Sequence, residues 1–300
     1  MATTIHPRLS AILVVLASAA VVFTTVGGAA LADTKQPPKF YLVGIGPGDP
    51  DLMTLRAVKI IEKADLIFCS ERWAEKLASH LKGKEVVHGY WRLFPYYGRD
   101  PSEFEGEERR ACEAITRKRN EFIAQVRGAV KQEKTVAVLA GGDPLIYGPS
   151  AWCLEEFEDL KPVVVPGVSC FNAANAALGR GITTSEHTKS VILTAGDWLG
   201  GTDTIEKMSV HRSTMVIFTM RTKFGEFIKK LSINYPPQTP VAIVKYAGYA
   251  QKEEVIRGTL ETIVDQVGGE KLPFPYLIYV GDFLAHRYKK SGKVQNSNKE

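Results

Sequence analysis

Short apolar runs alternate with amphipathic stretches from Lys39 onward, and this alternation constrains the fold more than any other feature of the sequence. Such alternation is typical of βα units that build a largely parallel sheet. The sequence therefore predicts an α/β protein. We expect strands at residues 40–43, 66–68, 86–87, 136–139, 163–165, 191–193, 215–218, 241–244 and 277–280, and a further strand at 255–256 paired in a hairpin.

The length of the chain, 300 residues, predicts two domains, because single cores seldom grow beyond about 250 to 300 residues. We expect the boundary where the strand at 163–165 ends in Pro166-Gly167. This gives an N-terminal α/β domain at 39–165, a C-terminal α/β domain at 166–286 and a polar tail at 287–300.

The distribution of charged residues and the spacing of cysteines indicate which kinds of ligand the chain can bind. The 38 basic and 33 acidic residues are spread along the chain, so the net charge of +5 is not gathered into a basic arm. We therefore expect a small-molecule ligand and no nucleic acid. The Cys and His residues lack metal-ligand spacing, so we expect no metal site. The favoured interpretation of the thiols at positions 69, 112, 153 and 170 is that they are buried or unremarkable.

The N-terminal segment has the layout of a secretory signal peptide. Residues 11–32 carry no charge, and Ala30-Leu31-Ala32 supplies a small-x-small cleavage pattern. We expect a signal peptide at 1–32, cleavage after Ala32, a linker at 33–38 and a periplasmic or secreted mature protein. The alternative is an uncleaved membrane anchor, because residues 11–32 are about long enough to cross a ~30 Å hydrocarbon core.

A glycine-rich loop at residues 44–50, GIGPGDP, follows the first expected strand and precedes a helix whose apolar positions include Leu52, Leu55, Val58 and Ile61. Glycines let main-chain groups approach a ligand closely. The loop lacks the Gly-Lys-Ser/Thr ending of a phosphate-binding loop and the third glycine of a dinucleotide fingerprint. A ligand loop and a plain tight turn both remain open for this segment.

Two more loops follow expected strands. GGDPLIYG occupies residues 141–148, and residues 166–177 turn from Pro166-Gly167 into a helix of small side chains. Ligands of open α/β sheets bind in the crevice beyond the carboxyl ends of the strands, so these loops predict one shared crevice. Asp143 can accept hydrogen bonds from ribose hydroxyls or an ammonium group there. It can also cap a helix through Trp152 and Leu154.

Taken in order, seven segments resemble the tetrapyrrole methylase family, which methylates uroporphyrinogen III and precorrins. They lie at residues 43–57, 140–148, 163–170, 214–220, 239–244, 256–260 and 279–283, and the resemblance runs from about Lys39 to Leu284. It implies a class III methyltransferase with a mostly parallel N-terminal sheet and a mixed C-terminal sheet. It also implies S-adenosylmethionine bound in the cleft between the two domains, S-adenosylhomocysteine as product, and a homodimer.

The resemblance also implies particular site residues. The contacts to S-adenosylmethionine carried over from the family are Pro47, Gly141, Gly142, Asp143, Ile146, Ser169, Cys170, Thr219, Met220 and Ala247. The stretch from Gly89 to Phe122 is longer than the family usually has. Its aromatic side chains could stack on a macrocycle, and its arginines could pair with carboxylates, which makes Tyr90, Arg92 and Arg99 candidate substrate residues. A loop packed on its own domain or on a dimer partner is the competing interpretation.

The chain departs from the uroporphyrinogen methylases at two positions. Those enzymes commonly carry candidate proton-transfer groups, an Asp and a Lys, where this chain has Ser70 and roughly Tyr90. The PGVSCFNAANAAL run is similar to precorrin-4 methyltransferases, so we expect C-methylation of a precorrin-like tetrapyrrole, with no catalytic side chain assigned. Because the leader separates the protein from cytosolic S-adenosylmethionine, the alternative is an exported tetrapyrrole carrier that has lost methyl transfer.

Overall fold

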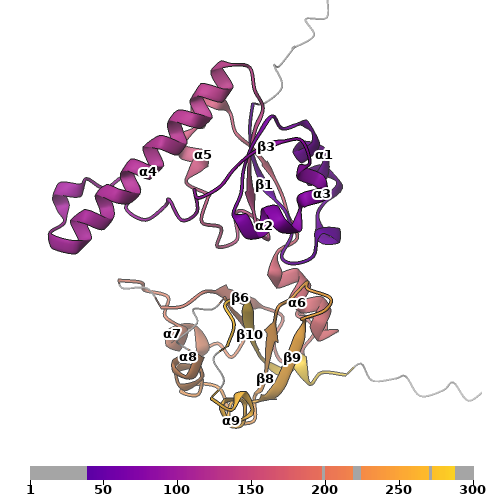
Figure 1. Cartoon of the computed structure of the whole chain (residues 1–300). Coiled ribbons are helices and arrows are strands. Elements are labelled where there is room, and N and C mark those ends of the chain that lie inside the picture. The colour runs from indigo at the N-terminus through magenta and orange to yellow at the C-terminus, as the bar shows by residue number, and fades with distance from the viewer. Residues whose placement is uncertain (1–38, 198–199, 219–223, 270–271, 288–300) are drawn as a thin grey trace, which may run out of the picture. The chain divides into compact units, whose positions relative to one another are not determined.

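The computed structural model describes residues 39–197, 200–218, 224–269 and 272–287, and these described residues belong to one unit of the chain (Figure 1). The predicted leader and linker lie outside the described residues, as do Thr219, Met220 and the tail from residue 288 onward. Within the described part of the chain, no helix combines the length and the apolar character needed to cross a membrane.

The first sheet is entirely parallel, with the strand order β3-β2-β4-β1-β5. Its strands are β1 (Phe40–Gly44), β2 (Leu66–Phe68), β3 (Glu85–Val87), β4 (Val136–Ala140) and β5 (Val163–Val165). Its helices are α1 (Leu55–Lys63), α2 (Glu71–Lys76), α3 (Ala78–Leu81), α4 (Gly106–Lys131) and α5 (Cys153–Glu156).

The second sheet is mixed, with the order β6-β7-β10-β8-β9, in which only β6 and β7 are parallel neighbours. Its strands are β6 (Val191–Thr194), β7 (Thr214–Phe218), β8 (Pro240–Lys245), β9 (Glu254–Thr259) and β10 (Tyr276–Val280). The accompanying helices are α6 (Cys170–Leu178), α7 (Ile205–Ser209), α8 (Phe224–Leu231) and α9 (Ile263–Val267). Every predicted strand is therefore confirmed, including the hairpin of β8 and β9.

Both faces of the first sheet are buried, which is why its strands read as continuous apolar runs. Along β1, Phe40 and Leu42 point into the core under α4 and α5, whereas Val43 packs on the opposite side with α1, α2 and α3. Figure 1 shows these two helical layers on either side of the sheet. The expected apolar face of α1 is partly wrong. Ala57 and Ile61 are buried, but Leu55 is the first helical residue and is 81% exposed.

The strand order brings the three glycine-rich turns together. Because β1 lies between β4 and β5, the loops that follow these strands meet at one edge of the sheet. The backbones touch directly. A Cβ added to Gly44 would lie 2.5 Å from the Gly167 nitrogen and 2.8 Å from the Gly142 oxygen, and one added to Gly167 would lie 2.1 Å from that same oxygen. These contacts leave no room for a methyl group.

We predict that Gly44→Ala destabilises the protein by at least about 1 to 3 kcal/mol, because the added methyl group forces apart backbone segments that no rotamer change can move. Chemical denaturation measures this difference. Gly128→Ala is the matched control, since a Cβ there would meet no atom of the described residues within 4 Å. That helical substitution should raise the free energy of unfolding by about 0.5 to 1 kcal/mol. Equal effects of the two substitutions would contradict the packing described here.

Candidate functional site

The loops after β1 and β4 are joined by main-chain hydrogen bonds. The Gly142 N–H donates to the Gly46 oxygen over 2.6 Å, and the Ile45 N–H donates to the Ala140 oxygen over 2.9 Å. Gly46 and Gly142 have φ values of 78° and 76°, in the region that favours glycine. Gly141 is needed for a different reason, because a Cβ there would lie 2.8 Å from the Trp73 indole. The glycines thus fix the shape of this sheet edge.

Asp143 is the one charged side chain among the predicted cofactor contacts. Its Oδ1 accepts a hydrogen bond from the Leu145 N–H over 2.9 Å and closes a short turn. The alternative prediction that it caps a helix through Trp152 and Leu154 is wrong, because α5 begins at Cys153 with Trp152 at its N-cap position. Oδ2 has no hydrogen-bond partner among the described residues and is available to a ligand.

The loop after β5 ends in a capped helix. Ser169, which is 2% exposed, is the N-cap of α6, and its hydroxyl accepts a hydrogen bond from the Phe171 N–H over 3.3 Å. Because the hydroxyl is used in this way, Ser169 contributes mainly by positioning the first turn of α6. Cys170 follows as the first helical residue, and burial raises the pKa of its thiol. The other three cysteines are buried, and all four are free, as expected.

A turn after β8 is held against the glycine loop at 44–50. The Asp49 N–H donates to the Gly248 oxygen over 2.7 Å, and the Asp49 carboxylate accepts from the Ala250 N–H over 2.8 Å. A Cβ added to Gly48 would lie 2.0 Å from the same Gly248 oxygen. A Cβ added to Gly248 would lie 3.0 Å from the Pro47 Cγ, so the turn that carries the buried Ala247 lies against Pro47.

Tyr147 lies in the loop after β4, and its residue type and position do not predict a role. The residue follows Ile146, which is half-buried, and has a φ of 55°. Its ring lies 4.7 Å from the Phe218 ring, and its hydroxyl donates to the Leu193 oxygen over 3.3 Å. Tyr147 therefore connects the loop after β4 with β6 and β7 of the second sheet. No spacing pattern in the sequence signals this contact.

The candidate substrate residues lie in differing surroundings. Tyr90 packs into its own domain, with its ring 5.7 Å from the rings of Phe68 and Phe122. Arg99 forms an ion pair with Glu103 at 2.6 Å. Arg92 is exposed and has a φ of 60°. The structure thus does not bring these three side chains together in one binding site.

Arg119 holds the aromatic loop on its own domain. This side chain of α4 is 5% exposed, and its guanidinium donates to the carbonyls of Leu93 at 2.8 Å, Pro95 at 2.5 Å and Tyr96 at 3.4 Å. Its cationic group also lies over the rings of Tyr97 and Trp152. The aromatic loop therefore packs on its own domain, as the competing interpretation of the sequence expected.

Ser70 and Tyr90 share a small cleft at the carboxyl ends of β2 and β3. The cleft has a volume of about 10 Å³, near the space that one water molecule needs, and Cys69, Trp91 and Ser150 contribute to its walls. The two positions at which the chain departs from the uroporphyrinogen methylases are therefore neighbours. Burial raises the pKa of the Cys69 thiol to about 11, so this thiol remains protonated at neutral pH.

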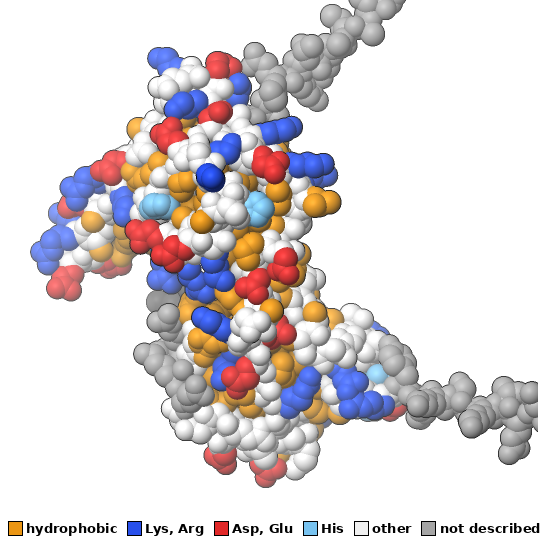
Figure 2. All heavy atoms as spheres, turned by 45° about the vertical axis from the view of Figure 1, so that its right-hand side comes forward, with side chains coloured by type: hydrophobic (Ala, Val, Ile, Leu, Met, Phe, Trp, Pro, Cys, Tyr) orange, Lys and Arg blue, Asp and Glu red, His pale blue; other side chains and the backbone are white. Residues whose placement is uncertain are grey.

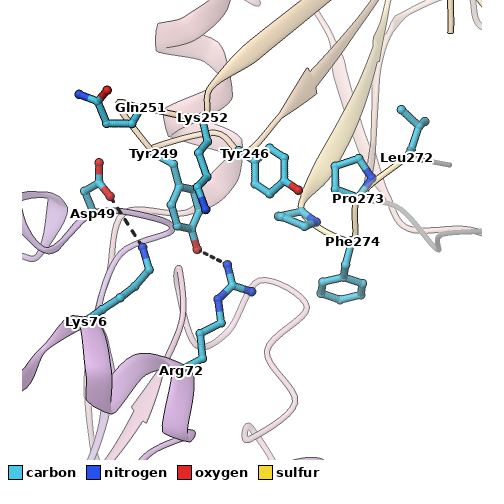
Figure 3. A pocket seen from close by; sticks show the side chains of 11 residues that line it. Asp49, Arg72, Lys76, Tyr246, Tyr249, Gln251, Lys252, Leu272, Pro273 and Phe274 are labelled. Atoms are coloured by element: carbon cyan, nitrogen blue, oxygen red, sulfur yellow. Dashed lines mark hydrogen bonds and ion pairs between the residues drawn. The ribbon is translucent and has the colours of Figure 1, made fainter. Parts of the chain in front are cut away.

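A much larger cavity of about 600 Å³ lies between α2 and the segments that flank β8 and β10. Figure 3 shows Arg72 and Lys76 extending from α2 toward Tyr249 and Asp49. None of the predicted cofactor or substrate residues lines this cavity. Sequence reasoning missed it because Arg72 and Tyr249, which share a 2.7 Å hydrogen bond, are 177 positions apart.

Surface charge on one face, and metal-ligand geometry among the described residues, were compared with the sequence predictions of no nucleic-acid partner and no metal site. On the face drawn in Figure 2, basic and acidic side chains are interspersed without a continuous basic band. Among the described residues, no group of three or more His, Cys, Asp or Glu side chains is arranged to hold a metal ion. The candidate site therefore consists of the backbone-rich loops and the nearby cavity.

These features define a class of protein: a two-sheet α/β chain whose ligand loops meet at the carboxyl edge of its parallel sheet. The chain belongs to the tetrapyrrole (corrin/porphyrin) methylases, whose family model matches residues 39–264. It is 31% identical over 271 residues to the cobalt-precorrin-4 C(11)-methyltransferase of Methanocaldococcus jannaschii. The aligned region covers 87% of this chain and 94% of that protein. It spans about half the length of similar siroheme synthases, such as that of Ectopseudomonas mendocina.

Solved structures confirm the fold. A cobalt precorrin-4 methyltransferase superposes with a TM-score of 0.64 at 23% identity, covering 82% of this chain and 95% of that one. The uroporphyrin-III C-methyltransferase of Thermus thermophilus, complexed with S-adenosylhomocysteine, gives a TM-score of 0.59 at 22% identity, covering 82% and 99%. The predicted pairing of a parallel N-terminal sheet with a mixed C-terminal sheet is correct.

We predict that Arg119→Met lowers the free energy of unfolding by about 3 kcal/mol, because it leaves buried carbonyl oxygens without a donor. Hydrogen exchange should also become faster in residues 93–97. Arg117→Met, an exposed position on the same helix, is the control and should change stability by no more than about 0.5 kcal/mol. Native-like stability and exchange in the Arg119 variant would show that the guanidinium does not hold this loop.

Proposed function

We propose that this protein is an S-adenosylmethionine-dependent C-methyltransferase that acts on a tetrapyrrole of the precorrin type. The observation that carries the proposal is the convergence of three glycine loops on Asp143, whose Oδ2 is available to a ligand, in a chain of the tetrapyrrole methylase family. The similarity to the M. jannaschii enzyme over nearly its full length supports a precorrin-like substrate.

The residues at this edge fit S-adenosylmethionine. Among the described residues, a Cβ at Gly142 would meet one atom within 4 Å, the Cys170 nitrogen at 3.9 Å, so this part of the chain leaves space above that glycine for a ligand. Asp143 would accept hydrogen bonds from ribose hydroxyls, while Pro47, Ile146 and Ala247 would supply apolar contacts. When bound, the cofactor provides an electrophilic methyl group for a nucleophilic ring carbon.

The protein's own contribution is to position the reactants. Methyl transfer to carbon requires the two reacting centres in line about 3 to 3.5 Å apart, and orientation can supply much of the acceleration. No protein nucleophile is needed. Burial keeps the Cys170 thiol protonated by raising its pKa, so this side chain serves as a neutral wall.

The predicted leader favours a second candidate function, an exported carrier that binds a tetrapyrrole without methylating it. The loops at 44–50 and 141–148 argue against this candidate, because a carrier would not need a cofactor site. We also propose that the protein is a homodimer, as the family resemblance implies, and sedimentation of the purified chain would measure this.

We predict that the purified chain binds S-adenosylhomocysteine with micromolar affinity in calorimetric titration, and that Asp143→Ala abolishes the signal. Asp143→Asn should retain the turn to Leu145 but bind more weakly, because a neutral acceptor makes hydrogen bonds about half as strong as a charged one. Asp265→Ala, an exposed aspartate on α9, is the control and should bind as the native chain does.

Two outcomes of this titration separate the candidates. Binding that depends on Asp143 supports the methyltransferase. Absence of binding by a well-folded chain would contradict it and favour the carrier.

We propose further that residues 1–32 are removed on export to the periplasm or the medium. Expression of the full chain followed by N-terminal sequencing of the extracytoplasmic fraction should give a protein that begins at Asp33. Recovery of a full-length species in membranes would instead support the anchor through residues 11–32.

A further inference from the structure

The cavity beside α2 is built from four separate segments of the chain. Helix α2 supplies Arg72 and Lys76, the loop after β1 supplies Asp49, and the segment before β10 supplies residues 272–275. The turn after β8 supplies Tyr246, Tyr249, Gln251 and Lys252. Its volume of about 600 Å³ lies in the range of small-molecule sites in proteins. The cavity is therefore large enough to hold a substantial part of a metabolite.

Positive charge dominates the lining. Among the described residues that line the cavity, Arg72, Lys76 and Lys252 face a single carboxylate, that of Asp49. This carboxylate already accepts the Ala250 N–H and lies 3.7 Å from the Lys76 ammonium. Burial lowers the pKa of Lys76, Asp49 opposes the shift, and repulsion from Arg72 and Lys252 adds to it. An anion in the cavity would relieve this repulsion between like charges.

Tyr249 holds two of these cations in place. The Arg72 guanidinium donates to the Tyr249 hydroxyl over 2.7 Å, and the Lys76 ammonium lies 4.0 Å from the centre of the ring. Tyr249 is itself buried, with 6% exposure. The ammonium group of Lys252 has no hydrogen-bond or ion-pair partner among the described residues. Two cations are thus preorganised, and a third is available to a ligand.

The opposite side of the cavity is apolar. Tyr246, Pro273 and Phe274 line it, and the Tyr246 N–H donates to the Pro275 oxygen over 2.8 Å, which ties the two segments together. Figure 3 shows Phe274 and Pro273 across the cavity from Arg72. A ligand that suits both sides has an apolar, flat body and several anionic groups. Inorganic phosphate and simple phosphate esters have the charge without that body.

The cavity adjoins the proposed cofactor loops. Asp49 lies two positions after Pro47, and Tyr246 immediately precedes Ala247. We propose that this cavity binds the carboxylate groups of the tetrapyrrole substrate, with Arg72, Lys76 and Lys252 as their cationic partners and Phe274 against the ring system. The proposal rests on the proposed function and replaces Arg92 and Arg99 as the expected carboxylate partners.

The test is a titration of the full-length chain with uroporphyrin III, a stable porphyrin rich in carboxylates, followed by porphyrin absorbance. Arg72→Gln, Lys76→Gln and Lys252→Gln should each weaken binding by about tenfold, because each removes a charge-assisted contact. Lys252→Glu should weaken it further. Coproporphyrin III, which has fewer carboxylates, should bind less tightly, and inorganic pyrophosphate should compete poorly.

Three comparisons make the result decisive. Lys59→Gln, an exposed position on α1, should bind uroporphyrin as the native chain does. Because Lys252 is exposed, its variants should fold normally and keep the test valid even if the Arg72 variant is unstable. Titration of the same preparations with S-adenosylhomocysteine should show unchanged affinity, so failure of the cofactor site is distinguished from failure of this cavity.

Native-like uroporphyrin binding by all cavity variants would overturn the proposal, as would weakening by Arg92→Gln alone. Stronger competition by pyrophosphate than by coproporphyrin would also overturn it, because the cavity would then recognise a phosphate group. Loss of S-adenosylhomocysteine binding in the native chain, with porphyrin binding still dependent on the three cations, would refute the methyltransferase and leave the cavity assignment standing.

Discussion

The backbone contact among Gly44, Gly142 and Gly167 is the constraint on which the rest of the site depends. Strands β1, β4 and β5 are hydrogen-bonded neighbours, so the turns that follow them must pass one another within a few ångströms. Only glycine permits that approach. Once the turns are packed, the direction of the chain into Asp143 on one side and into α6 on the other is fixed.

This packing explains why the site holds so few ionisable groups. The loops present main-chain atoms and small side chains, and Asp143 is the one charged side chain among the predicted cofactor contacts. The three cations of the neighbouring cavity come from α2 and the turn after β8, which the Asp49 contacts hold against the glycine loop. The same turn, residues 246–250, therefore serves both the proposed cofactor contact and the cavity.

Much of the fold could be predicted because apolar runs such as Val136–Ala140 are long enough to identify a buried strand without further information. The exact starts of helices and their capping residues are harder to predict from the sequence. Asp143 was a reasonable helix cap by residue type, but α5 begins ten residues later, and a turn lies between. Leu55 matched a helical period, yet it is the first residue of α1 and points to solvent. Periodicity does not reveal where a helix begins relative to its core.

Side-chain contacts between residues far apart in the chain cannot be predicted from this sequence. Arg72 and Tyr249 belong to no recognisable motif, so the sequence does not predict their hydrogen bond. In the sequence, Arg119 resembles the other charged residues of its helix, and only the fold reveals its three carbonyl partners. The stretch after Gly89 is unusually rich in aromatic residues, and this composition favours the interpretation that the stretch binds a ligand. Their packing shows that Tyr90 and Tyr97 are partly buried and pack against the hydrophobic core of the first sheet.

A crystal structure of the protein with S-adenosylhomocysteine would show directly whether the glycine loops bind the cofactor. We expect electron density for the ligand against Gly142, Asp143 and Cys170, with Ala247 on the opposite side. Density for the ligand inside the cavity lined by Arg72 and Lys252, or away from the glycine loops altogether, would contradict it.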